Sequence, residues 1–316
     1  MVVSMFGPLT VVDGEHKACG RELGGAKLRD LLAILLLARG HPVSKDALAD
    51  SLWGEALPKN VAGTLEQYVC MLRRRLFCDP ERARRVIVTE YNAYRLDASE
   101  ESVDLDRFDE LLVRAEHAPV PDRRVLLEQA VELACGDLVE DAPYASWIEP
   151  HREVYRHLVA RARLWLAHDC VLAGDFVAAI RHSEIALHFA PYSEQAFRTI
   201  MLSDHALGHQ DLARATYVRC RDLLADSLDT DPTTETAQLA SAIDAGAPLS
   251  SVIDAFVALR CPNPQQEPMM QMNTDRGVAK AHGRNRMRVV LHRTSGSATA
   301  LPAGAAMLRT PHVAVV

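Results

Sequence analysis

One stretch of the sequence combines side chains that can read base edges with arginines that can bind phosphates. Its members are Asn60, Thr64, Gln67, Met71, Arg73, Arg74 and Arg75. A glutamine can pair with adenine, a hydroxyl can bond several bases, a methionine can pack on a thymine methyl, and an arginine can bind guanine or phosphate. These residue types together predict contact with double-stranded DNA.

The same stretch has the period of an amphipathic helix. With about 100° of rotation per residue, four apolar residues fall within about 60° of one another. These are Leu65, Val69, Leu72 and Leu76. The polar and basic residues then lie on the other side, where a helix in the major groove would present them to bases and phosphates. Taken alone, the three arginines also fit a solvated helix C-terminus, where cations favour the helix dipole.

The neighbouring elements predict a winged helix around this stretch. We expect strands at residues 2–6, 9–12 and 19–23, helices at 27–40, 44–54 and 60–77, an arginine-rich loop after residue 80, and short strands at 86–89 and 94–96. Strands, three helices and a hairpin follow one another in the winged-helix order. The loop and hairpin add Arg82, Arg84, Arg85, Asn92 and Arg95 as predicted DNA contacts.

The rest of the chain is predicted to be mainly helical. Helices are expected near residues 104–117, 122–135, 146–173, 175–190, 193–208, 211–226 and 233–244. Gly174 and Gly208 each end a helix, and their spacing of 34 residues is the period of a tetratricopeptide helix pair. The fold class is therefore mainly α with a small β component. Its expected domains are a winged helix over 1–97, a tetratricopeptide-like helical domain over 98–246, and a disordered basic tail over 247–316.

Charge is divided by region along the chain. Residues 1–97 carry a net charge of +2, residues 98–261 of −14 and residues 262–316 of +5, within a total of −7. A basic front and an acidic domain behind it are typical of proteins that contact nucleic acid.

Composition excludes several other classes of protein. The chain is 48% hydrophobic and 24% charged, as in soluble globular proteins, and no apolar run approaches the ~20 residues that span a bilayer. No signal peptide is recognised at the N-terminus. The seven cysteines are widely spaced without a C-x-x-C pair, which favours reduced thiols. We therefore expect a cytoplasmic protein with no membrane contact.

Enzyme, cofactor and metal motifs fail on their spacing. The segment 20–27 lacks the lysine position of a phosphate-binding loop, because Gly25 is followed by Ala26. His205 and His209 are four residues apart next to Asp204, but no H-E-x-x-H pattern is present, and a surface pair is the simpler interpretation. The sequence predicts neither catalysis nor a cofactor.

Motifs in order along the chain resemble one known family. They are Phe6-Gly7-Pro8-Leu9, the helix at 27–37, Leu48-Ala49-Asp50-Ser51-Leu52-Trp53-Gly54, Tyr68-Val69-Cys70-Met71-Leu72-Arg73-Arg74, Tyr94-Arg95-Leu96, Asp104-Leu105-Asp106-Arg107-Phe108, Gly136-Asp137-Leu138, Trp147 and Ala190-Pro191-Tyr192-Ser193-Glu194. As an ordered set they resemble the Streptomyces antibiotic regulatory protein family. That family joins a winged helix, similar to the output domain of response regulators, to a helical bacterial transcriptional activation domain. The resemblance covers residues 2–246.

The resemblance implies binding to direct repeats beside promoters and activation through contact with RNA polymerase. It implies two protomers side by side on DNA, and a polymerase-contacting loop formed by Glu55, Ala56, Leu57, Pro58 and Lys59. Where the family has a glycine before Tyr-Arg-Leu, this chain has Ala93, so Asn92 is expected to supply any left-handed conformation in the wing. The family also has arginine or another polar residue where Met71 stands.

Two other functions remain open at this stage. The chain could be a protein-interaction adaptor, in which the acidic helical repeats form the working surface and DNA binding is weak or non-specific. It could also be a regulator that senses a small molecule in the concave face of the repeats, although no residue set in the sequence specifies a ligand.

Overall fold

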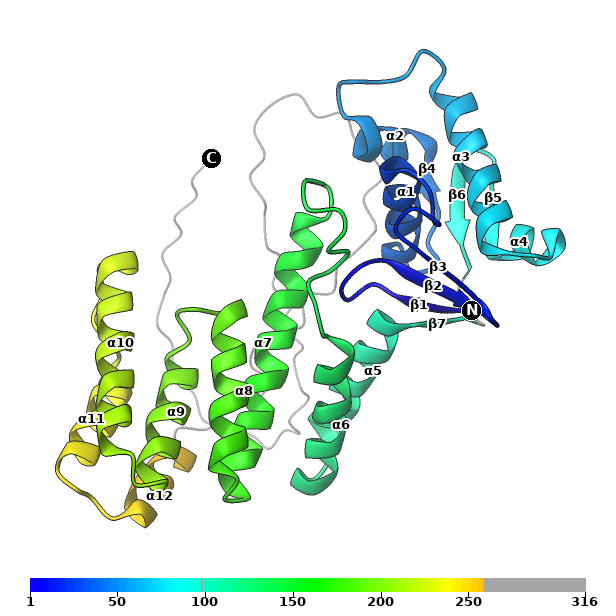
Figure 1. The fold of residues 1–316 in the computed structure, drawn as a ribbon. Helices are drawn as coiled ribbons and strands as arrows, with labels where there is room; N and C mark the ends of the chain where they lie inside the picture. The colour runs from blue at the N-terminus through cyan, green and yellow to red at the C-terminus, as the bar shows by residue number, and fades with distance from the viewer. Residues whose placement is uncertain (98, 100, 259–316) are drawn as a thin grey trace, which may run out of the picture. The chain divides into compact units, whose positions relative to one another are not determined.

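The computed structural model describes residues 1–97, 99 and 101–258 (Figure 1). The chain begins with a sheet of strands β1 (Val2–Ser4), β2 (Thr10–Asp13), β3 (His16–Cys19) and β7 (Ser102–Val103), in the order β3-β2-β1-β7. β1 and β2 are antiparallel, as are β2 and β3, whereas β7 runs parallel to β1. The predicted third strand was placed too late, because residues 20–23 form a turn ahead of the first helix.

The winged helix follows this sheet. It consists of α1 (Ala26–Leu37), β4 (Val43–Ser44), α2 (Lys45–Trp53), α3 (Val61–Leu76), α4 (Pro80–Val86), β5 (Ile87–Thr89) and β6 (Ala93–Leu96). β4, β6 and β5 form an antiparallel three-stranded sheet. The Ser44 hydroxyl accepts a hydrogen bond from Ala47 N at 3.1 Å and caps α2, so this helix begins where it was predicted.

The expected arginine-rich loop is a helix, and that prediction was wrong. α4 has Pro80 in its first turn, and the Asp79 carboxylate caps it by accepting a hydrogen bond from Glu81 N at 2.9 Å. Proline fits the first turn because its missing N–H would have no partner there. The Asp79-Pro80 pair therefore starts a helix.

The helical part of the chain contains eight described helices. They are α5 (Asp104–His117), α6 (Val120–Leu133), α7 (Glu149–Leu172), α8 (Phe176–Phe189), α9 (Glu194–Ala206), α10 (Gln210–Leu228), α11 (Thr234–Asp244) and α12 (Leu249–Ala258). Successive helices from α5 to α12 pack against one another. Gly174 and Gly208 have φ angles of +75° and +82° and follow α7 and α9, as the repeat spacing predicted. No helix among the described residues is long and apolar enough to cross a bilayer.

The predicted C-terminal tail includes one more helix. The tail was expected to begin at residue 247, but residues 249–258 form α12, whose Val252 and Phe256 are buried. The remainder of that predicted tail, 259–316, lies outside the described residues. The described residues form one compact unit, and the domain limits at 97 and 246 stay predictions.

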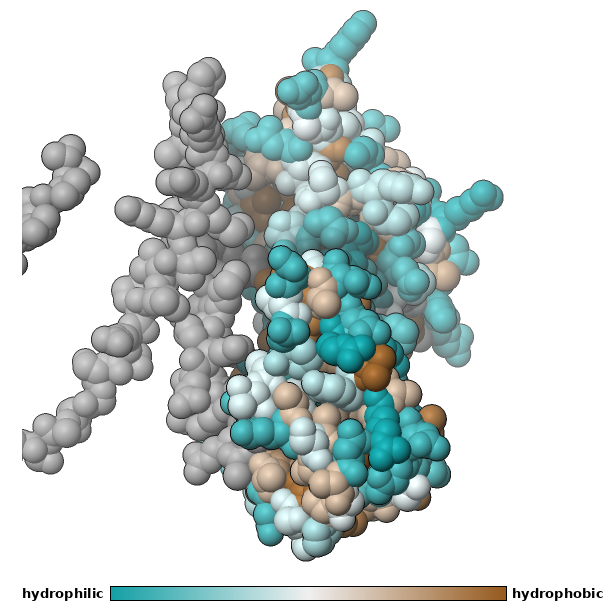
Figure 2. Space-filling model, turned by 90° about the vertical axis from the view of Figure 1, so that its left-hand side faces the viewer, coloured by the Kyte–Doolittle hydropathy of each residue, from teal (hydrophilic) through white to brown (hydrophobic). Residues whose placement is uncertain are grey.

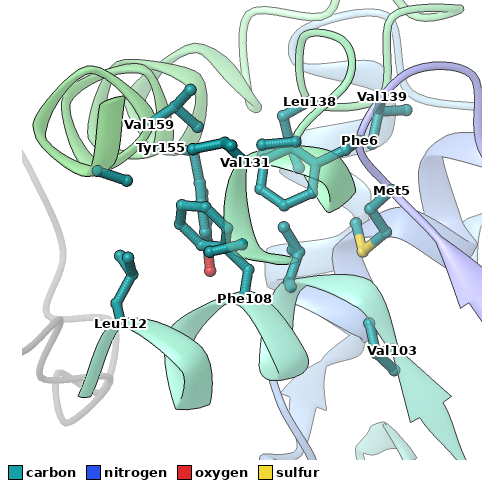
Figure 3. Packing of buried hydrophobic residues seen from close by; sticks show 14 of the residues in the cluster. Met5, Phe6, Val103, Phe108, Leu112, Val131, Leu138, Val139, Tyr155 and Val159 are labelled. Carbon is teal, nitrogen blue, oxygen red and sulfur yellow. The ribbon is translucent and has the colours of Figure 1, made fainter. Parts of the chain in front are cut away.

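The N-terminal sheet and the helical domain share one hydrophobic core. The ring of Phe6, just after β1, lies 5.2 Å from that of Phe108 in α5 and 5.7 Å from that of Tyr155 in α7, centroid to centroid. Figure 3 shows these side chains within the buried cluster. The Asp104 carboxylate accepts hydrogen bonds from Met5 N at 2.7 Å and Phe6 N at 3.0 Å. Because these contacts are buried and join residues about one hundred positions apart, the two parts of the chain are packed as one body.

A segment between α6 and α7 clamps the start of the chain. Gly7 N donates to Asp137 O at 2.8 Å, and Val139 N donates to Met5 O at 2.8 Å. A Cβ at Gly136 would lie 2.9 Å from Gly7 Cα, so only glycine allows this approach. This contact makes the resembling motif Gly136-Asp137-Leu138 a structural element of the junction.

Candidate nucleic-acid interface

α3 lies with its apolar stripe inward, as its spacing predicted. Leu65, Val69, Leu72 and Leu76 are at most 2% exposed. The helix packs against α1, α2 and α4. Asn60 caps its N-terminus, because the side-chain Oδ1 accepts a hydrogen bond from Gly63 N at 3.0 Å. The burial of one face leaves the other directed to solvent.

The outward face of α3 differs in part from the predicted one. Asn60, Gln67, Arg74 and Arg75 are exposed, in agreement with the helical wheel. Thr64 and Met71 are half-buried: the Thr64 hydroxyl donates to Asn60 O at 2.7 Å, and Met71 packs against the hydrophobic core. Their side chains flank the outward face and do not lie at its centre.

Arg73 is held by the wing. Its Nη2 donates to Ile87 O at 2.6 Å and to Thr89 Oγ1 at 2.8 Å, and its Nε donates to Ile87 O at 3.1 Å. Burial lowers the pKa of the Arg73 guanidinium from its ordinary value. The prediction that this side chain reaches phosphate is therefore not supported by its geometry. It fixes the angle between α3 and the hairpin.

The other arginines of this region fall into two groups. Arg74 and Arg85 are exposed, with no hydrogen bond or ion pair to any residue that the structure describes. Arg75 donates to Glu22 O at 2.8 Å, and Arg84 pairs with Glu81 at 2.8 Å, but both remain exposed.

Arg82, also a predicted DNA contact, is paired within the protein. Its guanidinium donates to Asp13 at 2.8 Å and to Glu101 at 3.0 Å. These two carboxylates raise the pKa of Arg82. The side chain ties α4 to the N-terminal sheet.

The wing turns without a left-handed residue. Asn92 is absent from the positive-φ residues among the described part of the chain, so the expected left-handed conformation there was wrong. Its carbonyl accepts a hydrogen bond from Lys45 N at 2.9 Å, which ties the turn to the start of α2. Arg95 is paired with Glu90 at 3.2 Å and Asp97 at 2.9 Å, and it is half-buried.

The structure adds residues that the sequence did not single out. Glu66 and Cys70 are exposed on α3, and Lys45 Nζ lies 3.3 Å from a Glu66 carboxylate oxygen. Tyr91, at the tip of the wing, is fully exposed. Extending the helical wheel to every polar position would have found Glu66 and Cys70. Lys45 and Tyr91 could be found only once the hairpin had been placed beside α2 and α3.

The predicted polymerase-contact loop is an irregular segment between α2 and α3. Glu55, Ala56, Leu57 and Lys59 are exposed and Pro58 is half-buried. Leu57 is 52% exposed. The loop therefore presents an apolar side chain between charged residues, close in sequence to the outward face of α3.

No group of three or more histidine, cysteine or acidic side chains in the described part of the chain is arranged to hold a metal ion. His205 and His209 are engaged elsewhere: His205 Nε2 lies 3.2 Å from Ala247 O, and His209 Nδ1 lies 3.8 Å from Asp204.

Comparison with known families follows the same division of the chain. Residues 23–96 match the family described as "Transcriptional regulatory protein, C terminal", and residues 103–244 match the "Bacterial transcriptional activator domain". The fold and these two family matches define a winged-helix, DNA-binding transcriptional activator with a helical domain.

Similar proteins are transcriptional regulators of actinobacteria. The chain is 27% identical to the transcriptional regulatory protein MoaR1 of Mycobacterium tuberculosis, over 66% of this chain and 69% of the relative. It is 31% identical to the regulatory protein AfsR of Streptomyces coelicolor, over 70% of this chain and 22% of AfsR. A solved structure of Mycobacterium tuberculosis EmbR in complex with a low affinity phosphopeptide superposes with a TM-score of 0.69 at 26% identity, covering 81% of this chain and 68% of that one. The chain belongs to the Streptomyces antibiotic regulatory protein family.

Proposed function

We propose that this protein activates promoters by reading directly repeated DNA sites with α3, and that two protomers lie side by side on those sites. Gln67 and Arg74 are assigned to base edges, with Asn60 and Thr64 at the start of the helix and Met71 at its flank. Arg75, Arg84 and Arg85 are assigned to phosphates, and Asn92 and Arg95 position the wing. Arg73 acts indirectly, by holding the hairpin.

One observation supports this proposal most strongly. α3 buries its apolar stripe, while Gln67 and Arg74 stand exposed without partners among the described residues. An arginine and a glutamine with unused donors on a helix that presents one face to solvent are suited to bidentate pairing with guanine and adenine in the major groove. The acidic helical domain, of net charge −14, would be repelled by DNA, which favours an orientation with α3 toward the duplex.

We further propose that the loop of Glu55, Ala56, Leu57, Pro58 and Lys59 contacts RNA polymerase. The loop combines a 52% exposed leucine with a carboxylate and an ammonium group, which suits a small protein contact with an apolar centre and a polar rim. The protein is proposed to act in the cytoplasm, where its DNA and polymerase are found, and without catalysis of its own.

DNA reading is tested by footprinting on promoter fragments from the protein's own gene neighbourhood. The double variant Gln67→Ala with Arg74→Ala is expected to lose the footprint, with affinity lowered at least about tenfold, since each bidentate base contact contributes about 1–3 kcal/mol. The matched control, Gln238→Ala with Arg221→Ala, removes the same side-chain types from exposed positions in α11 and α10. An unchanged footprint for the first variant would remove α3 from the recognition surface.

Polymerase contact is tested separately by transcription in vitro. The variant Leu57→Ser with Lys59→Ala is expected to occupy the promoter as wild type does but to produce less transcript. Val218→Ser with Arg221→Ala, at exposed positions in α10, is the control. Wild-type transcript levels from the loop variant would show that another surface recruits the polymerase.

The protein surface gives less support to the adaptor hypothesis. The large apolar residues that are exposed on the described part of the chain are dispersed over many elements, for example Val177 in α8, Leu212 and Val218 in α10, and Val125 in α6. Figure 2 shows a mostly hydrophilic face with scattered apolar residues. An adaptor surface would be expected to gather such residues into one patch.

A further inference from the structure

A hollow lies at the junction of the winged helix and the helical domain. Its volume is about 470 Å³, and it is lined by the N-terminal end of α1, the C-terminal end of α2 and the segment 141–147 that precedes α7. Ligand sites of this size commonly occur at junctions between domains. None of its lining residues is part of the proposed DNA surface or the proposed polymerase loop.

The charges around the hollow leave carboxylates in excess. Arg29 is already used, because its Nε lies 2.8 Å from the Asp141 carboxylate and its Nη1 donates to Gly24 O at 2.9 Å. Asp50 lines the hollow from α2 and has no ion pair with any described residue. The site is therefore suited to a cation, since an anion would meet unpaired negative charge.

A second carboxylate faces the hollow from α1. The Asp30 side chain is 9% exposed, and its one ion pair among the described residues is with Lys27, whose Nζ lies 3.9 Å away; the charge of Arg29 also acts on it. Burial raises the pKa of this carboxyl group. The Lys27 side chain is 47% exposed and can turn to solvent, leaving the Asp30 carboxylate for another cation.

Aromatic side chains complete the lining. Trp53 from α2 and Trp147 from the segment before α7 line the hollow, together with Tyr144. Tyr144 is 99% exposed, so its ring contacts almost nothing in the structure. Indole and phenol rings stack on flat apolar groups and attract cations through their π faces.

We propose that this hollow binds a small organic cation that carries a flat aromatic group. The ammonium group lies between the carboxylates of Asp30 and Asp50, and the ring packs among Trp53, Trp147 and Tyr144. An occupant of this site touches α1, α2 and the segment before α7, and so touches both the DNA-binding and the helical parts of the protein.

The test uses phenethylamine as the cationic probe, with phenylacetate and 2-phenylethanol as anionic and neutral probes of the same ring. Trp53 and Trp147 are two of the chain's three tryptophans, so tryptophan emission reports on the hollow during titration of the full chain. We expect phenethylamine to bind with a dissociation constant of about 1 mM, as suits so small a ligand. The other two probes are expected to bind at least about fivefold more weakly.

Variants separate this site from general charge effects. Asp30→Asn and Asp50→Asn should each weaken phenethylamine binding about fivefold or more. Asp50 is exposed, so Asp50→Asn keeps the test valid if Asp30→Asn, at a buried position, impairs folding. Asp46→Asn, exposed at the other end of α2, is the control and should bind as wild type. Equal binding of all three probes, no binding of the amine, or wild-type binding by Asp50→Asn would each overturn the proposal. DNA reading by α3 would be untouched by that result.

Discussion

Arg73 and Arg74 are neighbours in α3, yet the structure predicts that their removal affects different properties. Arg73 makes three hydrogen bonds to the wing, to Ile87 O and Thr89 Oγ1. Arg74 points to solvent without a described partner. Arg73→Ala should therefore lower stability, and Arg74→Ala should lower DNA affinity.

The size of each effect follows from these contacts. A hydrogen bond from a charged group contributes about 1.5–3 kcal/mol, and truncation of Arg73 leaves the Ile87 carbonyl without its donor. Water can replace part of this loss because Arg73 is half-buried, so we expect a net loss of about 2 kcal/mol. For a unit of this size, that corresponds to a decrease in Tm of about 4–8 °C. Arg74→Ala should leave Tm unchanged and lower DNA affinity by about 1–3 kcal/mol, the contribution of one bidentate base contact, with little change in the salt dependence of binding.

Two measurements on these variants distinguish a loss of stability from a loss of DNA affinity. Thermal unfolding gives the change in Tm, and fluorescence anisotropy with promoter DNA at several salt concentrations gives affinity and slope. Arg74→Lys should restore part of the lost affinity, because lysine can also bind guanine, whereas Arg73→Lys should not restore the three hydrogen bonds of Arg73. The reasoning fails if Arg74→Ala destabilises the protein as much as Arg73→Ala does, or if both variants lose DNA binding equally at unchanged Tm.

Two further predictions concern acid stability and the junction between the two parts. Burial and the nearby Arg163 lower the pKa of His182 to about 4 from 6.5. The unfolded chain therefore takes up a proton first, and the free energy of unfolding should fall by up to about 3 kcal/mol as the pH drops from about 6.5 to about 4. Urea unfolding at a series of pH values should show a weaker pH dependence in His182→Gln, and an equal pH dependence in both proteins would contradict the prediction. Gly136→Ala places a methyl group 2.9 Å from Gly7 Cα and should lower the free energy of unfolding by about 1–3 kcal/mol. Gly25→Ala, with open space around the added Cβ, should lower it by well under that, and chemical unfolding measures both. Equal losses would show that the backbone around Gly7 shifts to accept the methyl group without strain.

Much of the secondary structure could be predicted because it depends on neighbours in sequence. The structure confirms three local predictions: the start of α2 near residue 44, the start of α3 near residue 60 and the apolar stripe of α3. α4 was missed because Asp79-Pro80 reads equally as a turn or as a helix start, and only packing of the buried Ala83 and Val86 favours the helix. α12 was missed for a similar reason, since its helix buries Val252 and Phe256 against the core.

The DNA interface could be predicted in outline but not residue by residue. A helical wheel distinguishes inward from outward positions, and Gln67 and Arg74 are on the predicted outward face. It cannot show that Arg73 reaches the wing or that Arg82 pairs with Asp13, because those partners are 14 and 69 residues away along the chain. Arginines that are equivalent in sequence therefore differ in whether a neighbouring residue in the fold already binds them.

The sequence by itself determined the order of elements, the face that α3 buries and the division into a basic front and an acidic helical part, because each depends on residue type and short-range spacing. The tertiary structure alone decided which arginines remain available to DNA, how Gly136 allows the clamp on Gly7, and where Asp30 and Asp50 meet aromatic side chains. These contacts join residues distant in sequence, and their energies depend on burial and distance, which residue order does not specify.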